Sequence, residues 1–439
     1  MAVAPGRLYP AGNIGGGAMI FRCADWAGMA GGLVLLMAMP ALAAVPVPPA
    51  TPEALAYHRD LDWFWLADQL FAFGIPVLLL ITGWGARLCR WCGRVTGGRW
   101  FWTLALFASV YLATLWVLSF PLDFAEGFLN QHAFGLSNQS FGRWLQNEVV
   151  GLAVNCLQAG LTLWLPYLLL RRSPRRWWLW SALGLAPLFL VIVVIQPIWI
   201  SPLFNHFGPL DDKVLETKVL AEAARGGITD APVFVMDQSS DSKRPGAYVA
   251  GLFGTKRIVL YDTLVQDMTP DEVLFVVGHE MKHYLLGDVW KLVGGFLVVL
   301  LIGLLVVDWL GRAVLRRWSG RFGFDRLDDP ASLPLLGVLF TLVFLVATPA
   351  LNLVTQDIEH EADRFGLEMT QNNDAAAEAF VKLQTEALGV PEPGWLERVF
   401  RMDHPALKDR IVFANRYHPW IDGQKLIYGD WIKPLEQSP

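Results

Sequence analysis

Charged residues are scarce in this chain. Asp, Glu, Lys and Arg make up only 17% of its 439 residues, whereas hydrophobic residues make up 54%, with 20 Trp and 26 Phe. An ordinary soluble domain carries about 25% charged residues. The composition therefore excludes a simple soluble domain and predicts a protein that crosses a membrane several times.

The sequence also lacks a basic surface and a disulfide framework. The formal net charge is −5 and the isoelectric point lies near 5.9, which argues against nucleic acid as a partner. The four cysteines are too few and too scattered for a disulfide scaffold. Cys89 and Cys92 have the spacing of a metal site but no second pair, so we interpret them as bystander thiols.

Six apolar runs are long enough to cross about 30 Å of hydrocarbon. They cover residues 63–85, 100–121, 149–170, 177–199, 289–311 and 333–355. Residues 27–44 form a seventh candidate, although the small residues near Ala44 also suit a signal-peptidase site. Residues 1–44 are thus a signal peptide or a first transmembrane helix, and residues 45–199 form a membrane region of four spans.

The segments between the spans differ in charge. Three are dense in arginine: residues 87–99, 171–176 and 312–326. The positive-inside rule places these in the cytoplasm, and alternation then places residues 200–288 and 356–439 on the outer face. With the signal-like N-terminus, this pattern favours a bacterial inner membrane with the polar domain in the periplasm. The two polar segments must assemble with each other across the two-span hairpin of residues 289–355.

The first polar segment begins with strand patterns and ends with a helix. Residues 231–238 and 247–264 are rich in Val, Ile, Phe and Tyr, which predicts a small sheet with a turn near residues 254–256. In TPDEVLFVVGHEMKHYLLGD, Thr269 is the predicted N-cap, and Glu272 completes a capping box with it. Gly287 suits the end of this helix.

Three residues on that helix suit metal-assisted hydrolysis. His279 and His283 are four residues apart, so both imidazoles leave one face of the helix and can bind a single ion. Glu280 is turned away by about 100° and can act as a base on the attacking water. This is the HExxH pattern. A catalytic zinc needs three protein ligands and an open fourth position, so one donor is missing.

The second polar segment offers candidates for that donor. TQDIEHEADRFGLEM, residues 355–369, contains no Gly or Pro before Gly366, which predicts a helix. Its possible donors are Glu359, His360, Glu361 and Asp363. Glu359 and Asp363 share one face of the helix, but spacing alone does not choose among the four.

HEMKH followed by IEHEAD resembles the HExxH and ExxxD pair of the M48 metalloendopeptidases, in particular the integral-membrane Ste24 type, which includes the CAAX prenyl proteases and bacterial relatives. GAYVAGLFGTKRIVLYDTL is similar to the family's strand and hairpin before the zinc helix, and DHPALKDRI to its C-terminal His-Pro and Arg element. The resemblance implies a mainly α, polytopic membrane protein of six or seven transmembrane helices. Its zincin-like α+β metalloprotease domain would carry a small β-sheet.

The resemblance also implies residue roles. Glu359 would be the third ligand of a single zinc ion, and Asp363 would be a second acidic residue that acts as a proton donor. On physical grounds, Asp363 can also orient a zinc-bound histidine by accepting its free N–H. His404 and Arg410 match the C-terminal element, where either can stabilise the developing oxyanion.

Two positions depart from the family pattern. Gly246 stands where the family usually has Asn before the Ala-Tyr of its strand, and Thr355 and Gln356 stand where it has a Ser-Arg pair. The first departure puts one side-chain contact with substrate in doubt, while the backbone donors of the strand remain. Neither departure touches an expected metal ligand.

The sequence thus predicts a membrane zinc endopeptidase in which Glu280 accepts the water proton and passes it to the leaving amine. Its substrates would be membrane-associated or misfolded proteins, bound in extended form along residues 247–251. One alternative is a site-2-type intramembrane protease, but residues 333–355 contain no Asp-Gly element to supply its third ligand. The other is a non-enzymatic membrane transporter that binds metal with no open coordination position.

Overall fold

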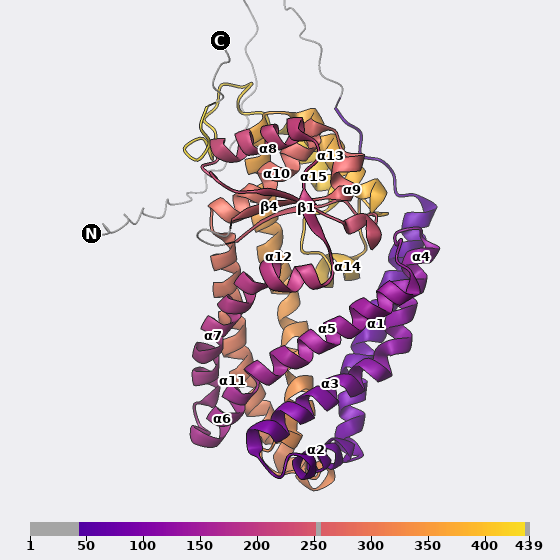
Figure 1. The fold of residues 1–439 in the computed structure, drawn as a ribbon, viewed down its shortest axis with the longest axis vertical. Coiled ribbons are helices and arrows are strands. Elements are labelled where there is room, and N and C mark those ends of the chain that lie inside the picture. Colours follow the sequence, from indigo (N-terminus) through magenta and orange to yellow (C-terminus); the bar gives the residue numbers. More distant parts are fainter. Residues whose placement is uncertain (1–43, 252–255, 435–439) are drawn as a thin grey trace, which may run out of the picture. The chain divides into compact units, whose positions relative to one another are not determined.

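The computed structural model describes residues 44–251 and 256–434. The candidate signal peptide or first span at residues 27–44 therefore lies outside the described residues, apart from Ala44. Within them, six helical segments are long and apolar enough to cross a membrane, and each overlaps one predicted span (Figure 1). The mainly α membrane architecture with a small sheet is thereby confirmed.

The membrane region comprises α1 to α7 and the pair α11 and α12. Their bounds are α1 Pro52–Ile81, α2 Trp84–Val95, α3 Trp100–Phe124, α4 Gln131–Ala133, α5 Phe141–Thr162, α6 Trp164–Arg172, α7 Trp177–Ile195, α11 Asp288–Phe322 and α12 Leu333–Thr370. Between 0% and 33% of the most apolar stretch of each spanning segment is buried within the protein, so most of these side chains face outward. Such a large apolar surface is stable in the interior of a bilayer but unfavourable in water. Cys89 and Cys92 are buried, unbridged thiols of α2.

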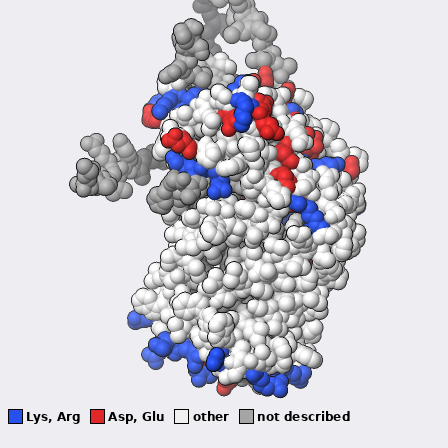
Figure 2. Space-filling model, viewed as in Figure 1, with Lys and Arg blue, Asp and Glu red and all other residues white. Residues whose placement is uncertain are grey.

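On the face seen in Figure 2, charged side chains gather toward the two ends of the membrane helices and leave an uncharged band between them. The arginine-rich segments 171–176 and 312–326 meet at the end remote from the sheet, where Arg171 and Arg316 border one cavity. Residues 87–99 belong to the same end, because Gly323 packs against Ala86. All three segments therefore share one face, as alternation of the spans requires.

The sheet has four strands in the order β1-β2-β4-β3. They are β1 Phe207–Pro209, β2 Val233–Met236, β3 Ala247–Ala250 and β4 Arg257–Tyr261. β2 and β4 are parallel, while β1 and β3 are antiparallel to their neighbours. The sequence patterns predict β2, β3 and β4 but miss β1, and the predicted turn falls mostly in the undescribed residues 252–255. β3 is an edge strand, which has β4 as its only strand partner among the described residues.

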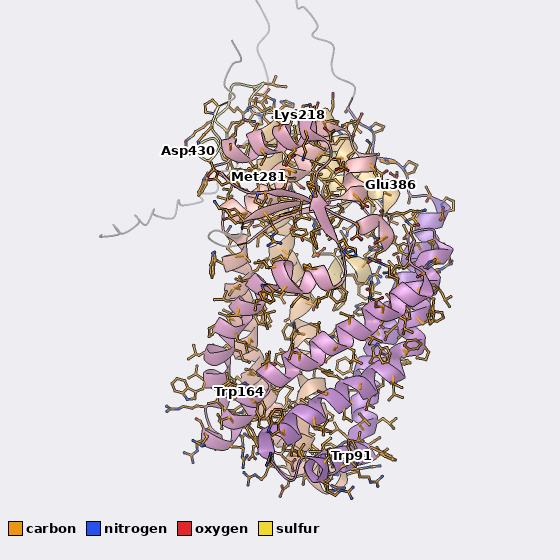
Figure 3. All side chains as sticks on the ribbon, in the orientation of Figure 1. Trp91, Trp164, Lys218, Met281, Glu386 and Asp430 are labelled. Carbon is orange, nitrogen blue, oxygen red and sulfur yellow. The ribbon has the colours of Figure 1, made fainter. Side chains whose placement is uncertain are left out.

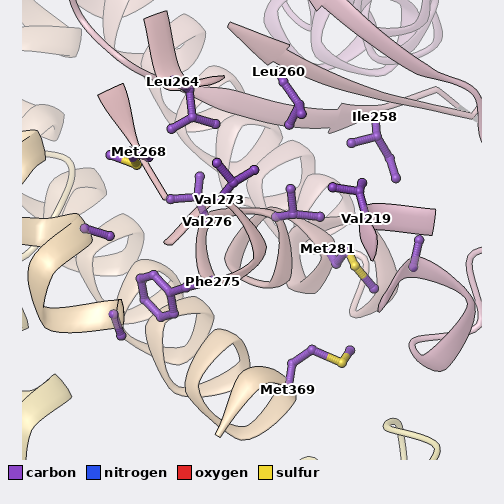
Figure 4. Close-up of a cluster of buried hydrophobic side chains, with 14 of the residues drawn as sticks. Val219, Ile258, Leu260, Leu264, Met268, Val273, Phe275, Val276, Met281 and Met369 are labelled. Atoms are coloured by element: carbon purple, nitrogen blue, oxygen red, sulfur yellow. The ribbon is translucent and has the colours of Figure 1, made fainter. Parts of the chain in front are cut away.

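Six helices complete the polar domain: α8 Lys213–Arg225, α9 Asp262–Asp267, α10 Pro270–Leu285, α13 Asn373–Glu386, α14 Trp395–Phe400 and α15 Leu407–Arg416. Val273 and Met281 of α10 share a buried cluster with Ile258 of β4 and Met369 of α12 (Figure 4). This cluster packs α10 between the sheet and the end of α12. The two polar segments of the sequence are therefore one packed unit.

α12 does not stop at the membrane. It continues for 38 residues, from the predicted span at residues 333–355 into the acidic segment that the sequence assigns to the following polar region. The expected boundary between residues 355 and 356 thus falls inside a helix. The acidic segment is a direct extension of a membrane helix.

Candidate metal centre

α10 carries the HExxH residues, and its sequence determines where it begins and ends. The predicted capping box is present: Thr269 N–H donates to Glu272 Oε2 at 2.6 Å, and Glu272 N–H donates to Thr269 Oγ1 at 3.4 Å. At the other end, Gly287 adopts a left-handed conformation with φ of 63°, which favours glycine. The helix therefore ends within one turn of His283.

α12 brings Glu359 to the two histidines. Nε2 of His279 lies 3.1 Å from Glu359 Oε2 and 3.4 Å from Nε2 of His283, and Nε2 of His283 lies 3.5 Å from Glu359 Oε1. One ligand atom from each residue lies within 4.8 Å of the others. For a tetrahedral zinc with bonds of about 2.0–2.1 Å, neighbouring ligand atoms are about 3.3 Å apart. The donor set therefore fits a zinc ion in both chemistry and spacing.

Each histidine is held at its other ring nitrogen by an aspartate. Nδ1 of His279 lies 2.9 Å from Asp363 Oδ1, and Nδ1 of His283 lies 3.0 Å from Asp288 Oδ2. A carboxylate at Nδ1 fixes the tautomer that leaves Nε2 free as a ligand. Sequence reasoning missed Asp288. The available signal is that Gly287 directly precedes it and reverses the chain, which returns Asp288 toward the helix that has just ended.

Asp363 is fully buried, and both of its oxygens accept hydrogen bonds from Arg410. Arg410 Nε donates to Oδ2 at 2.9 Å, and Nη2 donates to Oδ1 at 2.6 Å. The guanidinium also lies over the ring of Phe380, with its carbon 4.3 Å from the ring centroid. This geometry suits Asp363 for orienting His279. It also occupies two of the three nitrogens of Arg410 that an oxyanion could use.

The other sequence candidates lie in different places. His360 and Glu361 contact Arg364 and Tyr428, on another face of α12. His404, in the loop before α15, lies at the centre instead, with Nε2 3.2 Å from Glu359 Oε2 and about half of its side chain exposed. Of the four candidate donors on α12, Glu359 lies beside Nε2 of His279, and Asp363 lies on the other side of this ring, at Nδ1.

Two glycines allow α10 and α12 to approach this closely. A Cβ atom at Gly366 would lie 3.1 Å from the backbone N of His279, and one at Gly278 would lie 3.3 Å from the Cα of Gly366. Neither backbone atom can move aside without shifting a helix. Close contact of the two helices at these glycines places the HExxH face against Glu359 and Asp363.

Glu280 lies between two cavities that flank the centre. One, of about 390 Å³, is lined by apolar side chains that include Phe275 and Val390, and reaches the start of β3 at Ala247. The other, of about 620 Å³, reaches the end of β3 at Ala250. Burial raises the pKa of the Glu280 carboxyl above its usual range, although the two histidines oppose this shift. Both cavities therefore border β3 as well as Glu280.

An HExxH helix that meets a carboxylate of a second helix, at the end of a set of transmembrane helices, defines the class of membrane metallopeptidases. The chain belongs to peptidase family M48: residues 209–417 match Peptidase family M48, and residues 39–206 match the CAAX prenyl protease N-terminal region of five membrane helices.

Relatives agree with this assignment. The chain is 32% identical over 353 residues to YhfN of Bacillus subtilis, described as an uncharacterized metalloprotease, with 79% of this chain and 82% of that protein covered. It is 26% identical to the CAAX prenyl protease 1 homolog of Homo sapiens, with 77% and 78% covered. The crystal structure of S. mikatae Ste24p has the same fold, with a TM-score of 0.71 and 21% identity, covering 82% of this chain and 87% of that one.

The protein is therefore an integral-membrane metalloendopeptidase of the Ste24 type, which acts on peptide or protein substrates at the membrane. Members of this family use a metal, typically zinc. Family membership excludes both the site-2-type protease and the transporter as the class of this protein.

Proposed function

We propose that His279, His283 and Glu359 hold one zinc ion and that Glu280 is the base for peptide hydrolysis. The observation that carries this proposal is the group of three donors within 4.8 Å of one another. Two imidazoles and one carboxylate suit zinc better than magnesium or calcium, which prefer oxygen ligands alone. When bound, zinc supplies Lewis-acid polarisation of the scissile carbonyl and lowers the pKa of water toward neutrality.

Glu280 takes a proton from the attacking water and delivers it to the leaving amine. Its place between the two cavities gives it access to both steps. Asp363 and Asp288 are positioning residues, because each accepts the Nδ1 proton of one histidine. His404 is the better partner for the developing oxyanion, because it borders both cavities, whereas Arg410 borders one and is buried against Asp363.

A Glu280→Gln variant tests this assignment. We expect one zinc ion per chain by elemental analysis, while chelator-sensitive cleavage of casein falls by about 10²–10⁴-fold. Glu361→Gln is the matched control, because Glu361 bonds Tyr428 and Arg364 instead of the centre. Full activity of Glu280→Gln, or wild-type protein with no metal-dependent cleavage of any peptide, contradicts the proposal.

The substrate chain is proposed to add to the free edge of β3. Tyr261 N–H donates to Gly246 O at 2.9 Å, so this pair is hydrogen-bonded, and by alternation Tyr248 also bonds β4. The backbone groups of Ala247 and Val249 then face the open edge. A substrate bound through these groups is recognised by its backbone more than by its side chains.

Val249→Pro removes the N–H that faces this edge. All hydrogen bonds between β3 and β4 keep their donors. We expect peptide turnover to fall about tenfold with zinc content unchanged, because one backbone hydrogen bond to substrate is lost. Val249→Ala controls for the side chain. Turnover of Val249→Pro equal to that of Val249→Ala removes the strand-addition proposal.

Membrane-associated or misfolded proteins are the proposed substrates. Prenylated CAAX peptides are a second candidate class, because several relatives are named CAAX prenyl proteases.

We also propose that the chain lies in a bacterial inner membrane with the protease domain in the periplasm. The gathering of arginines at the opposite end supports this orientation. Alkaline phosphatase fused after residue 210 and after residue 439 should be active, and inactivity at both positions overturns the orientation.

A further inference from the structure

A second cavity of distinct chemistry lies at the end of the protein remote from the metal centre. It has a volume of about 480 Å³ and is bordered by the end of α6, the last turns of α11 and the loop between α11 and α12. We call it the arginine pocket, because Arg171, Arg312, Arg316 and Arg326 all line it. None of these residues takes part in the proposed hydrolysis.

Arginines, leucines and a serine line the arginine pocket. Leu170, Leu315 and Leu327 line the pocket but are nearly fully buried, with exposed fractions of 4%, 5% and 5%. Ser319 adds a hydroxyl group. The pocket therefore presents mainly polar and cationic groups, with little leucine surface.

Two of the four arginines lack an anionic partner. Arg326 forms two hydrogen bonds with Asp328, and Arg312 pairs with Asp308 and donates to Pro174 O. Arg171 and Arg316 form no ion pair within residues 44–251 and 256–434, and Arg171 lies 5.3 Å from the ring centroid of Trp100. Four arginines and two aspartates line the pocket, which leaves a net positive charge for an anion to neutralise.

Tryptophans indicate the depth of this end in the bilayer. Trp91 and Trp164 lie at the same end of the membrane helices (Figure 3), and Trp309 and Trp318 of α11 are 67% and 42% exposed on either side of Arg312 and Arg316 in the sequence. Exposed tryptophans concentrate where hydrocarbon meets the headgroups. The arginine pocket therefore lies at headgroup depth, beside the phosphates of one leaflet.

We propose that the arginine pocket binds the phosphate group of an anionic phospholipid. Arg171 and Arg316 contact the phosphate oxygens, and the acyl chains lie against the outward-facing apolar side chains of the neighbouring membrane helices. A guanidinium presents several donors in one plane and suits phosphate. Basic pockets between transmembrane helices at the membrane surface are suited to acidic headgroups. The position of the pocket at headgroup depth, beside outward-facing apolar helices, favours a lipid over free phosphate.

Native mass spectrometry of the full chain in detergent tests the proposal by titration with dioleoylphosphatidylglycerol. The Arg171→Gln/Arg316→Gln variant should bind this lipid about tenfold or more weakly than the wild type, because each arginine near a membrane phosphate contributes appreciably to binding. Arg171→Lys/Arg316→Lys should keep most of the affinity. The matched control is Arg94→Gln/Arg321→Gln, which removes the same charge from exposed positions outside the pocket and should bind like the wild type.

Two further ligands separate the possible sources of the phosphate. Dioleoylphosphatidylcholine should bind more weakly than phosphatidylglycerol, and glycerol 3-phosphate should not bind measurably. Equal binding of phosphatidylglycerol by the wild type and the Arg171→Gln/Arg316→Gln variant overturns the proposal, and so does equal binding of the two lipids. Tight binding of glycerol 3-phosphate assigns the pocket to a soluble phosphate instead. Unchanged zinc content and elution volume show that the variants remain folded.

Discussion

The two helices that supply the proposed ligands are positioned in different ways. α10 has 16 residues, begins at its own capping box, and ends near Gly287 within one turn of His283. α12 has 38 residues and carries Glu359 on the extension of a membrane span. The first helix lies wholly within the polar domain, whereas the second begins in the membrane region and ends packed against the first. Three predictions test how far the metal centre depends on each helix.

Asp363→Asn is expected to have the largest effect, because Asp363 of α12 has two partners, His279 and Arg410. It weakens the acceptor at His279 Nδ1 and leaves the buried Arg410 without its anion. Zinc affinity should fall by about 10–100-fold, and the protein should lose about 3–5 kcal/mol of stability. Competitive chelator titration and thermal melting measure the two effects.

Asp409→Asn, at an exposed position beside Arg410, should change neither quantity. If Asp363→Asn keeps full zinc affinity but loses turnover, the proton-donor role implied by the family resemblance is favoured over the positioning role.

Gly366→Ala tests the contact between the two helices. The new methyl group would lie 3.1 Å from the backbone of His279, so the helices must separate. We expect a destabilisation of about 1–3 kcal/mol, as for other overpacked interiors, together with weaker zinc binding. Gly294→Ala on α11 is the control, because nothing lies within 4 Å of that position and alanine favours a helix. A melting temperature of Gly366→Ala at or above that of the control would show that the contact has room for a side chain.

Glu222→Gln is expected to have an effect only at high pH, where it should be no larger than that of Gly366→Ala. Glu222 of α8 lies against Gly278 of α10, and neither of its carboxylate oxygens has a hydrogen-bond partner within the described residues. Burial raises the pKa of Glu222 to about 8, from an ordinary value of 4.5. Between these two pH values the unfolded chain releases a proton that the folded protein retains. The contribution of Glu222 to stability is therefore fully present below pH 4.5 and is lost as the pH rises toward 8.

At pH 8 the free energy of unfolding of the Glu222→Gln variant should therefore exceed that of the wild type by on the order of 1–3 kcal/mol, which raises its melting temperature. At pH 4.5 the two proteins should be close in stability. Melting curves across this pH range, with Glu378→Gln at an exposed position as the control, measure the difference. Parallel curves for the wild type and Glu222→Gln would mean that this carboxyl is not responsible for the pH dependence.

The parts of the fold that the sequence predicts are those encoded by neighbouring residues. The capping box at Thr269, the HExxH spacing and the apolar length of the spans are local patterns, and all appear in the structure. The three residues of β1 are too short to show an alternating pattern and form a strand because they pair with β2. The continuity of α12 is hidden because composition changes at the membrane surface while the backbone remains helical.

The centre follows the same division. His279, Glu280 and His283 come from one helical turn, whereas Glu359 and Asp363 needed the family resemblance to be singled out from four candidates. Asp288 and Gly366 were missed, because their roles arise only from contacts with other parts of the fold. A glycine inside a helical pattern indicates a close approach only when the partner helix is known.

The unbroken course of α12 places a constraint on the length of its span. About 39 Å of helix separates Leu333 from Glu359, at about 1.5 Å per residue. Deleting one residue anywhere between them would withdraw the carboxylate by about 1.5 Å and rotate it by about 100° around the helix axis. The span therefore fixes the distance between Glu359 and the end of the protein at which α12 begins. With Glu359 as the proposed zinc ligand, the number of residues in the span is constrained by the position of that carboxylate as well as by the thickness of the bilayer.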